Sequence, residues 1–407
     1  MFPFVNIGER EEARPLLEGL HASLLTRLSN VSGLEVLSRT SVTNFGNGEL
    51  APMEIADSLG AEWVVEGETQ LVGDEVQVNA QLIDSETNAH AWAASYRRTL
   101  TAESLFAIQT EIARRIVGSL EAELTSTEAA RVARRPTSDL EAYRLYVRGR
   151  GQLIQRTDSS IARAEELFRR AVERDSTFAP AWAALAQALV IYPGRRDNDP
   201  DSVFPLGQEA ARRALQLDSD LAQAHAALSI IDFYRMRLPL ALRRMKRAVD
   251  IEPSFALGYH GLNLAHLVLG RPEEALEYAQ RSVALSPLEP QNQAGLAWAA
   301  SAVGDHGRAL RAARRMRDLE PDYGGPFLEA YSLYRMGRLT EGDTAVGRWV
   351  KRQLLALEAA RSGDPAPALA LLDRFRESLD FPIMPIGVLQ AALNRREQAI
   401  ETFRRIS

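Results

Sequence analysis

The sequence predicts a multi-domain chain of two fold classes, a small mixed α/β domain followed by an all-α solenoid. Short apolar segments of strand period and amphipathic segments of helical period alternate through the first part of the chain. Farther on, the pattern is helical throughout, and its landmarks recur at steps of 34 residues. We therefore expect an α/β domain over 1–124, a linker over 125–137, and a helical repeat array over 138–407 whose last units are degenerate.

Composition excludes several classes of protein. The chain has 407 residues, 46% hydrophobic and 25% charged, which is enough to bury a sizeable core. It has no cysteine, so disulfides, thiolate metal sites and a cysteine nucleophile are excluded. No apolar stretch is long enough for a membrane span, and no signal peptide is visible. We expect a cytoplasmic protein as the chain is written, or an extracytoplasmic one if the N-terminus is truncated.

Charge is divided unevenly along the chain. Residues 1–137 hold 11 arginines against 20 acidic residues, a net of −9, whereas residues 138–407 have a net of +3. Neither part is basic enough to bind nucleic acid on charge alone, so we expect no nucleic-acid partner. Arginines and a lysine spaced by three and four are expected to form exposed stripes on second helices of the repeats: Arg243, Lys246, Arg308, Arg311 and Arg315. They form either a solvated face or a surface for an acidic partner.

The first domain is expected to run strand, helix, strand, helix, three strands and a closing helix. The expected ranges are 2–5, 9–30, 34–42, 51–60, 62–72, 75–84, 89–100 and 102–124. Leucines at steps of four mark the first helix, and Gly60 stands where the second should stop. Apolar residues from Val76 to Leu82 alternate with polar ones, which indicates a strand with one wet face. The dipeptide at 73–74 is typical of a hairpin turn, and Asp139 is expected to cap the first repeat helix.

The stretch "QLIDSETNAHAW", residues 81–92, gathers groups that a hydrolase or a metal site could use. Asp84, Ser85, Glu86 and Asn88 are also the residues that a hairpin turn favours, because their short side chains bond the local backbone. A turn tip offers no pocket in which a base could be oriented, so we interpret the segment as a turn. His90 then pairs or caps at the start of the next strand.

The first domain resembles the TolB amino-terminal-like domain. The likeness rests on "PFVNIG", "LEVLSRTSVTNF", "ADSLGAEWVVEGETQLVGDEVQVNAQLIDSETNAHAWAASYRR" and "LFAIQTEIARRIVGSL", in that order, over about residues 2–120. The resemblance implies a small α/β module of bacterial signalling proteins, where it stands ahead of helical repeats. In such proteins an adenylate cyclase, a kinase or a DNA-binding domain often precedes it, and none is visible in this sequence.

The helical part carries an internal repeat. Ser219, Pro253, Pro287 and Pro321 follow one another at steps of 34 residues. Six residues beyond each landmark stands a large side chain, and Trp182 stands six after Ser176 in the same way. This period indicates pairs of antiparallel helices joined by a turn, with a proline that stops the second helix of each pair. The spacing of 43 residues between Ser176 and Ser219 departs from it, with the excess in "YPGRRDNDPDSVF".

The repeats resemble the tetratricopeptide repeat, with "YHGLNLAHLVLGRPEEALEYAQRSVALSP" over 259–287 as the best match. The resemblance implies a superhelix whose first helices line a concave groove that holds a peptide or a helix. The groove residues implied are Gln187, Phe233, Tyr234, Leu264, Leu267, Trp298 and Arg335. The basic residues of a carboxylate clamp are absent at the matching positions, which favours an apolar or amphipathic protein or peptide partner. The alternative is that these side chains only pack between helices.

We find no sequence motif for catalysis, so no catalytic residue, metal or cofactor is expected. Asp197, Asp199 and Asp201 have the spacing that begins a calcium loop, but Ser202 and Gln208 replace its turning glycine and its bidentate glutamate. An acidic inserted loop is the preferred interpretation. The leading functional hypothesis is a non-enzymatic scaffold. The alternative is a ligand-sensing regulatory module whose catalytic or DNA-binding domain lies outside this chain, for which a concave pocket near residues 125–150 would be the sign. The sequence leaves the partner and the oligomeric state open.

Overall fold

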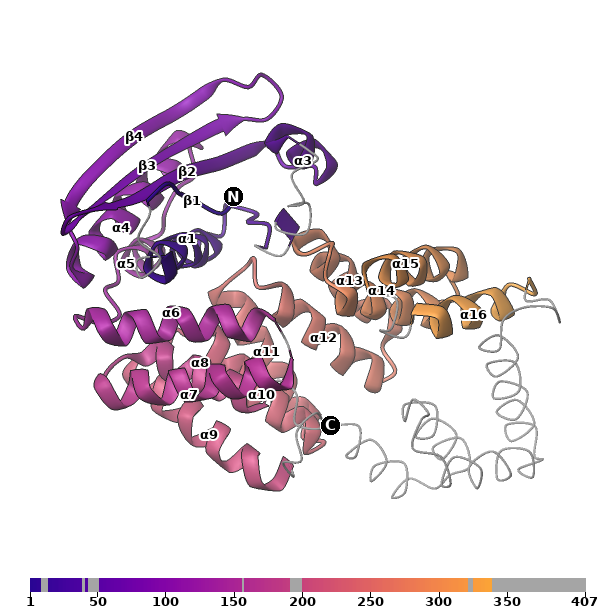
Figure 1. The fold of residues 1–407 in the computed structure, drawn as a ribbon. Coiled ribbons are helices and arrows are strands. Elements are labelled where there is room, and N and C mark those ends of the chain that lie inside the picture. The colour runs from indigo at the N-terminus through magenta and orange to yellow at the C-terminus, as the bar shows by residue number, and fades with distance from the viewer. Residues whose placement is uncertain are drawn as a thin grey trace.

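The computed structural model describes residues 1–8, 14–38, 41–42, 51–155, 157–190, 200–320 and 325–338. Figure 1 shows a small sheet with its helices at the N-terminal end, followed by a curved array of helices. A mixed sheet followed by an α-solenoid is therefore the observed fold class, as the sequence predicts. In the described part of the chain no helix is long and apolar enough to cross a membrane.

The sheet has the order β1-β2-β3-β4, with β1 parallel to β2 and the other neighbours antiparallel. Its strands are β1 (Val5–Asn6), β2 (Trp63–Val72), β3 (Glu75–Asp84) and β4 (His90–Thr99). Helices α1 (Arg14–Ser29), α3 (Pro52–Ser58) and α4 (Ala102–Ser119) complete this region, and Figure 1 shows α1 and α4 between the sheet and the first repeat helix. The alternation in β3 sends Val76, Val78 and Leu82 into a core shared with α1 and α4.

The segment between β3 and β4 is a turn. Asp84 Oδ1 accepts hydrogen bonds from the backbone nitrogens of Glu86 and Thr87, at 3.0 and 2.8 Å, and from the Thr87 hydroxyl at 2.9 Å. These hydrogen bonds lower the pKa of the Asp84 carboxyl below its ordinary value, and the two from Thr87 have the largest effect. Asn88 has a φ of 56°, the left-handed conformation that asparagine tolerates. The turn interpretation of residues 84–88 is confirmed.

The strand predicted over 34–42 is wrong. Residues 34–38 belong to no strand or helix, and residues 41–42 are helical, while 39–40 lie outside the described residues. The Ser38 nitrogen donates to the Leu285 carbonyl at 3.0 Å, so its partner comes from the repeats. Alternating apolar residues indicate an extended backbone, but they do not say which element supplies its hydrogen bonds.

The second region consists of consecutive helix pairs (Figure 1). The helices are α6 (Leu140–Ile154), α7 (Asp158–Arg174), α8 (Ala179–Val190), α9 (Pro200–Leu217), α10 (Ala222–Tyr234), α11 (Leu238–Ile251), α12 (Ala256–Val268), α13 (Pro272–Leu285), α14 (Pro290–Ala302), α15 (His306–Leu319) and α16 (Gly325–Arg335). Asp139 caps α6 by accepting bonds from the nitrogens of Glu141 and Ala142. The units predicted beyond 338 lie outside the described residues. The expected linker contains a helix of its own, α5 (Ser126–Val132).

The six-residue spacing of the repeat has a physical basis in hydrogen bonds. Trp182 Nε1 donates to the carbonyl of Ser176 at 3.1 Å, and Gln293 Nε2 donates to that of Pro287 at 2.8 Å. His225 Nε2 lies 3.1 Å from the carbonyl of Ser219 in the same way. A side chain on the first helix of each of these units thus satisfies the turn that precedes it, which would otherwise leave a carbonyl without a partner.

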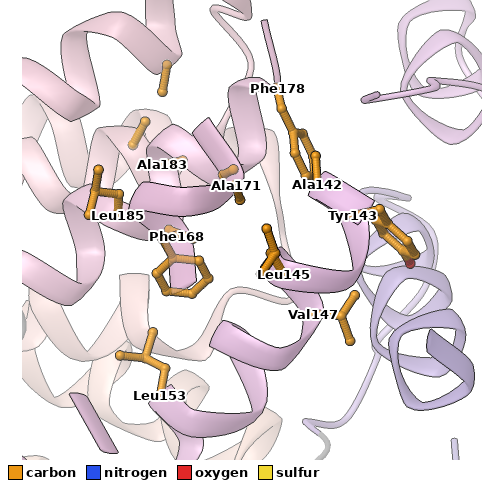
Figure 2. Packing of buried hydrophobic residues seen from close by; sticks show 14 of the residues in the cluster. Ala142, Tyr143, Leu145, Val147, Leu153, Phe168, Ala171, Phe178, Ala183 and Leu185 are labelled. Atoms are coloured by element: carbon orange, nitrogen blue, oxygen red, sulfur yellow. The ribbon is translucent and has the colours of Figure 1, made fainter. Parts of the chain in front are cut away.

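Helices α6 and α7 cross closely at Gly149. A Cβ built there would lie 2.5 Å from Cε1 of Phe168, whose ring is fully buried and cannot move aside (Figure 2). We expect Gly149→Ala to destabilise the protein by about 1–3 kcal/mol in urea denaturation. Gly151 lies on the same helix with open space around it, so Gly151→Ala should stabilise by about 0.5–1 kcal/mol. Equal shifts of the same sign in both variants would contradict this account of the crossing.

Candidate functional site

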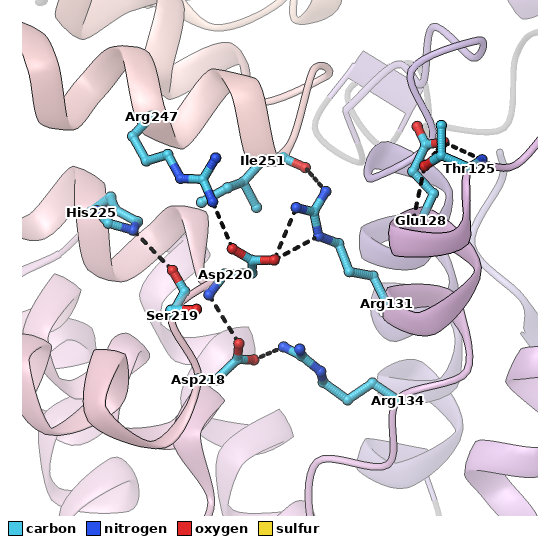
Figure 3. Close-up of polar contacts among 10 residues, drawn as sticks. All are labelled: Thr125, Glu128, Arg131, Arg134, Asp218, Ser219, Asp220, His225, Arg247 and Ile251. Carbon is cyan, nitrogen blue, oxygen red and sulfur yellow. Dashed lines mark hydrogen bonds and ion pairs between the residues drawn. The ribbon is translucent and has the colours of Figure 1, made fainter.

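Helix α5 and the chain after it are joined to the turns of the solenoid by ion pairs (Figure 3). Arg131 Nη2 lies 3.0 Å from Asp220 Oδ2, and Arg131 Nη1 donates to the Ile251 carbonyl at 3.4 Å. Arg134 pairs with Asp218, while Arg247 approaches the other oxygen of Asp220 at 2.8 Å. The hydrogen bond and charge of Arg131 lower the pKa of Asp220, against the effect of its burial. In both of these pairs between the regions, the net-negative first region supplies the arginine and the net-positive second region supplies the aspartate, so these pairs do not arise from the overall charge asymmetry.

The segment of residues 34–38 also lies against inter-repeat turns. The Ser254 hydroxyl accepts from the Val36 nitrogen at 3.1 Å and donates to the Leu34 carbonyl at 3.2 Å. Ser38 Oγ lies 2.6 Å from Ser286 Oγ, and Glu35 pairs with Arg281. The solenoid thus holds a piece of the first region mainly by main-chain hydrogen bonds, in the way that a groove holds a peptide.

We expect Arg131→Ala to weaken this contact, because the Asp220 carboxylate would lose its least exposed partner. Amide hydrogen exchange at Val36 and Ser38 should become about tenfold faster or more, which corresponds to a loss of about 1.4 kcal/mol in local stability. Arg135→Ala is the matched control, since Arg135 pairs with Glu103 at the surface of the first region. Unchanged exchange in Arg131→Ala would show that the two regions are held by other contacts.

A cavity of about 390 Å³ lies between the two regions. Helix α1 forms one wall with Gly19, Ala22, Ser23 and Thr26, and α6 forms another. The third wall comes from the first turns of α8, α10, α12 and α14, and it repeats the period of the sequence. Equivalent positions of four successive units line it: Phe178, Leu221, Phe255 and Glu289 in one set, and Pro180, Gln223, Leu257 and Gln291 in the next.

Arg150 and Glu252 both line this cavity, and within the described residues no ion pair joins them. Arg150 Nη1 donates to the Tyr146 hydroxyl at 3.1 Å, and its guanidinium lies 5.9 Å from the centre of that ring. The electrostatic interaction with the Tyr146 hydroxyl raises the pKa of Arg150. Glu252 is 8% exposed and accepts from Gln223 Nε2 at 2.9 Å. Burial raises the pKa of Glu252 to about 7, against the opposing effects of Arg150 and Gln223.

Among the predicted groove residues, Gln187 lines the cavity. Leu264 and Trp298 are half-buried, and each stands seven residues beyond a cavity residue, Leu257 or Gln291, on the same helix. Seven residues are two turns, so both side chains lie on the helix face that begins in the cavity. These three residues therefore belong to one continuous surface along the first helices.

The other groove candidates form pairs and local packing contacts. Phe233 and Tyr234 contact one another with ring centres 6.0 Å apart, and Tyr234 also packs on Phe204. Leu267 packs against the small alanine cluster of α13 and α14. Arg335 is exposed and donates to the Tyr331 hydroxyl at 3.3 Å, and the Trp298 ring lies 6.0 Å from the same tyrosine. Packing between helices thus accounts for part of this set.

Sequence reasoning missed Arg150, Gln223 and Glu252. The repeat carried a signal for two of them. Gln223, Leu257 and Gln291 each stand four residues after a landmark of the 34-residue period. Glu252 also carries the signal, because it stands one residue before its landmark, as Asp218 and Ser286 do, and all three line the cavity. No such signal marks Arg150, which the packing of another unit brings to the same cavity. Within the described ranges no group of His, Asp and Glu could hold a metal ion. Asp197 and Asp199, and the side chain of Asp201, lie outside the described residues.

Comparisons with known proteins give one curated relative. The chain is 34% identical over 186 residues to the protein named "Putative adenylate cyclase 3" of Rhizobium meliloti (strain 1021), a match that covers 46% of this chain. The chain covers only 31% of the length of that relative. No protein-family model matches the chain.

Several solved structures are similar in fold. PilF of Pseudomonas aeruginosa is 18% identical, with 62% of this chain and 97% of that chain covered and a TM-score of 0.40. PilW, described as a type IV pilus biogenesis factor, is 16% identical, with 54% and 94% covered and a TM-score of 0.41. YrrB, described as a TPR protein with an unusual peptide-binding site, is 15% identical, with 47% and 91% covered and a TM-score of 0.31. Likenesses of this size add nothing to the fold described above.

Proposed function

We propose that this chain is a non-enzymatic protein-interaction scaffold whose helical repeats hold a protein segment along their first helices. One observation carries the proposal: equivalent positions of four successive units line a single wall, and the same helix faces continue to Leu264 and Trp298. A regular surface of this kind suits an elongated partner, because each unit offers one contact at a fixed spacing. We propose the division into 1–124, 125–137 and 138–407 as the matching domain organisation.

The chemistry of this surface favours an apolar or amphipathic partner. Leu264 and Trp298 contribute apolar area, Gln187 contributes an amide, and no clamp of basic residues stands beside them. Phe233, Tyr234, Leu267 and Arg335 extend the proposed surface toward the ends of the helices. An amphipathic helix would bury its apolar stripe here and leave its polar side in water.

Photo-crosslinking from the full-length chain tests the groove directly. A photoreactive amino acid at position 264 should crosslink one defined partner in native cells, and the same probe at the exposed position 246 on α11 is the matched control. Leu264→Arg should also abolish recovery of that partner. Crosslinks from 246 but not from 264 would move the contact to the convex arginine stripes, and equal crosslinks from both would remove the groove proposal.

A second candidate function is a regulatory module that responds to a ligand. The cavity between the two regions favours it, because a molecule bound there would contact both and change how firmly they are joined. The name of the curated relative is consistent with an output domain of cyclase type, but this chain covers under one third of that protein. The two candidate functions differ in their ligand, which is a protein segment in the groove for the first and a small molecule in the cavity for the second.

A further inference from the structure

The cavity holds an arginine without an anionic partner. In the described part of the chain Arg150 has no ion pair, and its one hydrogen bond is to the neutral Tyr146 hydroxyl. Removing a guanidinium from bulk water without a counter-charge costs several kcal/mol, so the position is a ready anion site. Tyr146 is itself fixed by Phe178, with ring centres 5.1 Å apart, which holds the arginine in place before any ligand arrives.

A carboxyl group faces the same space from another unit. Glu252 is held by Gln223 through one oxygen, Oε2, and no ion pair joins it to Arg150 within the described residues. The two charges influence one another, since each appears among the causes that shift the other's pKa. They are therefore near enough to share a ligand and too far apart to neutralise one another directly.

From this juxtaposition we propose that the cavity binds a small zwitterion, an amino acid or a dipeptide, with its carboxylate on Arg150 and its ammonium on Glu252. The planar guanidinium fork suits a carboxylate, and the oxygen of Glu252 that Gln223 does not occupy can accept from an ammonium. The bound ammonium would favour the ionised form of Glu252, whose burial disfavours that form in the empty cavity.

Size and wall chemistry narrow the ligand further. About 390 Å³ lies at the small end of the range for small-molecule pockets, which suits one or two residues of peptide. Apolar side chains including Val147, Phe178, Phe255 and Leu257 line the walls, so an apolar ligand side chain is preferred. Arg27, Arg131 and Arg134 also line the cavity, but Arg131 and Arg134 are paired with Asp220 and Asp218. A polyanion such as a nucleotide would also meet the Glu252 and Glu289 carboxyls, and these oppose its binding.

Calorimetry on the full-length chain tests the proposal with defined probes. L-leucine and the dipeptide Leu-Leu are titrated alongside the N-acetylated and C-amidated forms of each, at pH 7.5. We expect heat of binding from at least one zwitterion and a loss of affinity of tenfold or more in each blocked form. No binding by either zwitterion, or equal binding by the blocked forms, would overturn the proposal.

Variants assign the two ends of the ligand. Arg150→Gln should lower the affinity for the zwitterion tenfold or more and leave the affinity for the C-amidated form unchanged. Glu252→Gln should lower the affinity for the zwitterion to the same extent and leave the affinity for the N-acetylated form unchanged. Arg148→Gln is the matched control, because Arg148 is exposed on the same helix. Loss of affinity in Arg148→Gln equal to that in Arg150→Gln would contradict the assignment.

The binding result and the regulatory function can fail separately. The proposed site rests on the second candidate function only for the role of the ligand. Hydrogen exchange at Val36 and Ser38, with and without ligand, measures that role. Binding that leaves this exchange unchanged would keep the site and remove the regulatory role. Absence of binding would remove the site and leave the groove proposal to its crosslinking test.

Discussion

Replacing Tyr143 with alanine is expected to lower the free energy of unfolding by about 3–5 kcal/mol. The side chain is 1% exposed and lies where α6 meets α1 and α4 (Figure 2). Its ring meets Phe106 edge-on with centres 4.9 Å apart, and its hydroxyl donates to the Gly19 carbonyl and accepts from Gln109, each at 3.1 Å. Burial raises the pKa of this phenol to about 12. The substitution therefore leaves both a void and unpaired polar groups at the junction of the two regions.

Urea denaturation followed by circular dichroism measures this effect, and Tyr143→Phe separates its two parts. The phenylalanine variant keeps the ring and loses only the hydroxyl, so it should cost about 1–3 kcal/mol through the groups left unpaired. A loss below about 1 kcal/mol in Tyr143→Ala would show that the junction can close over the void. It would also show that this tyrosine does not join the first region to the repeats.

The second large effect is a pH-dependent gain of stability in Glu252→Gln. The pKa of Glu252 is about 7 in the folded protein against an ordinary value of 4.5, so the folded state retains a proton that the unfolded state releases. The native protein therefore loses stability as pH rises from about 4.5 through 7, by about 3 kcal/mol in all. Glutamine keeps the neutral form and the size, so the variant should equal the native protein near pH 4.5 and exceed it by about 3 kcal/mol at pH 8.

Free energies of unfolding at pH 4.5, 6 and 8 provide the comparison. Glu277→Gln is the control, since Glu277 is exposed on α13 and its replacement should leave the pH profile of the native protein unchanged. A constant difference between Glu252→Gln and the native protein across this range would contradict the raised pKa. In that case the carboxyl would be ionised in the folded cavity, with water or Arg150 compensating its charge.

The elements predicted correctly are those whose signal is local. The turn at 84–88 needs only short side chains that bond their own backbone, and the helix cap at Asp139 needs only the nitrogens that follow it. The 34-residue period is local in the same sense, because three units repeat one hydrogen bond from a side chain to the turn six residues before it. Such interactions form wherever the same residues recur.

The elements that sequence reasoning missed depend on surfaces that meet across the fold. The segment of residues 34–38 has the alternation of a strand, yet its hydrogen bonds go to Ser254 and Leu285, more than 200 residues away. Arg150 and Glu252 belong to different repeat units, and each by itself is an ordinary charged residue of a helical protein. For Arg150 no local pattern distinguishes a charge that will face solvent from one that will line a cavity.

The sequence by itself determined the two fold classes, the repeat and the helix face that its register marks. The tertiary structure alone decided that helix α1 and the segment of residues 34–38 cover the beginnings of those helices. Backbone conformation follows from neighbours along the chain, whereas burial and the pairing of charges follow from which finished surfaces pack together. That packing made a cavity between the two regions and left Arg150 and Glu252 lining it.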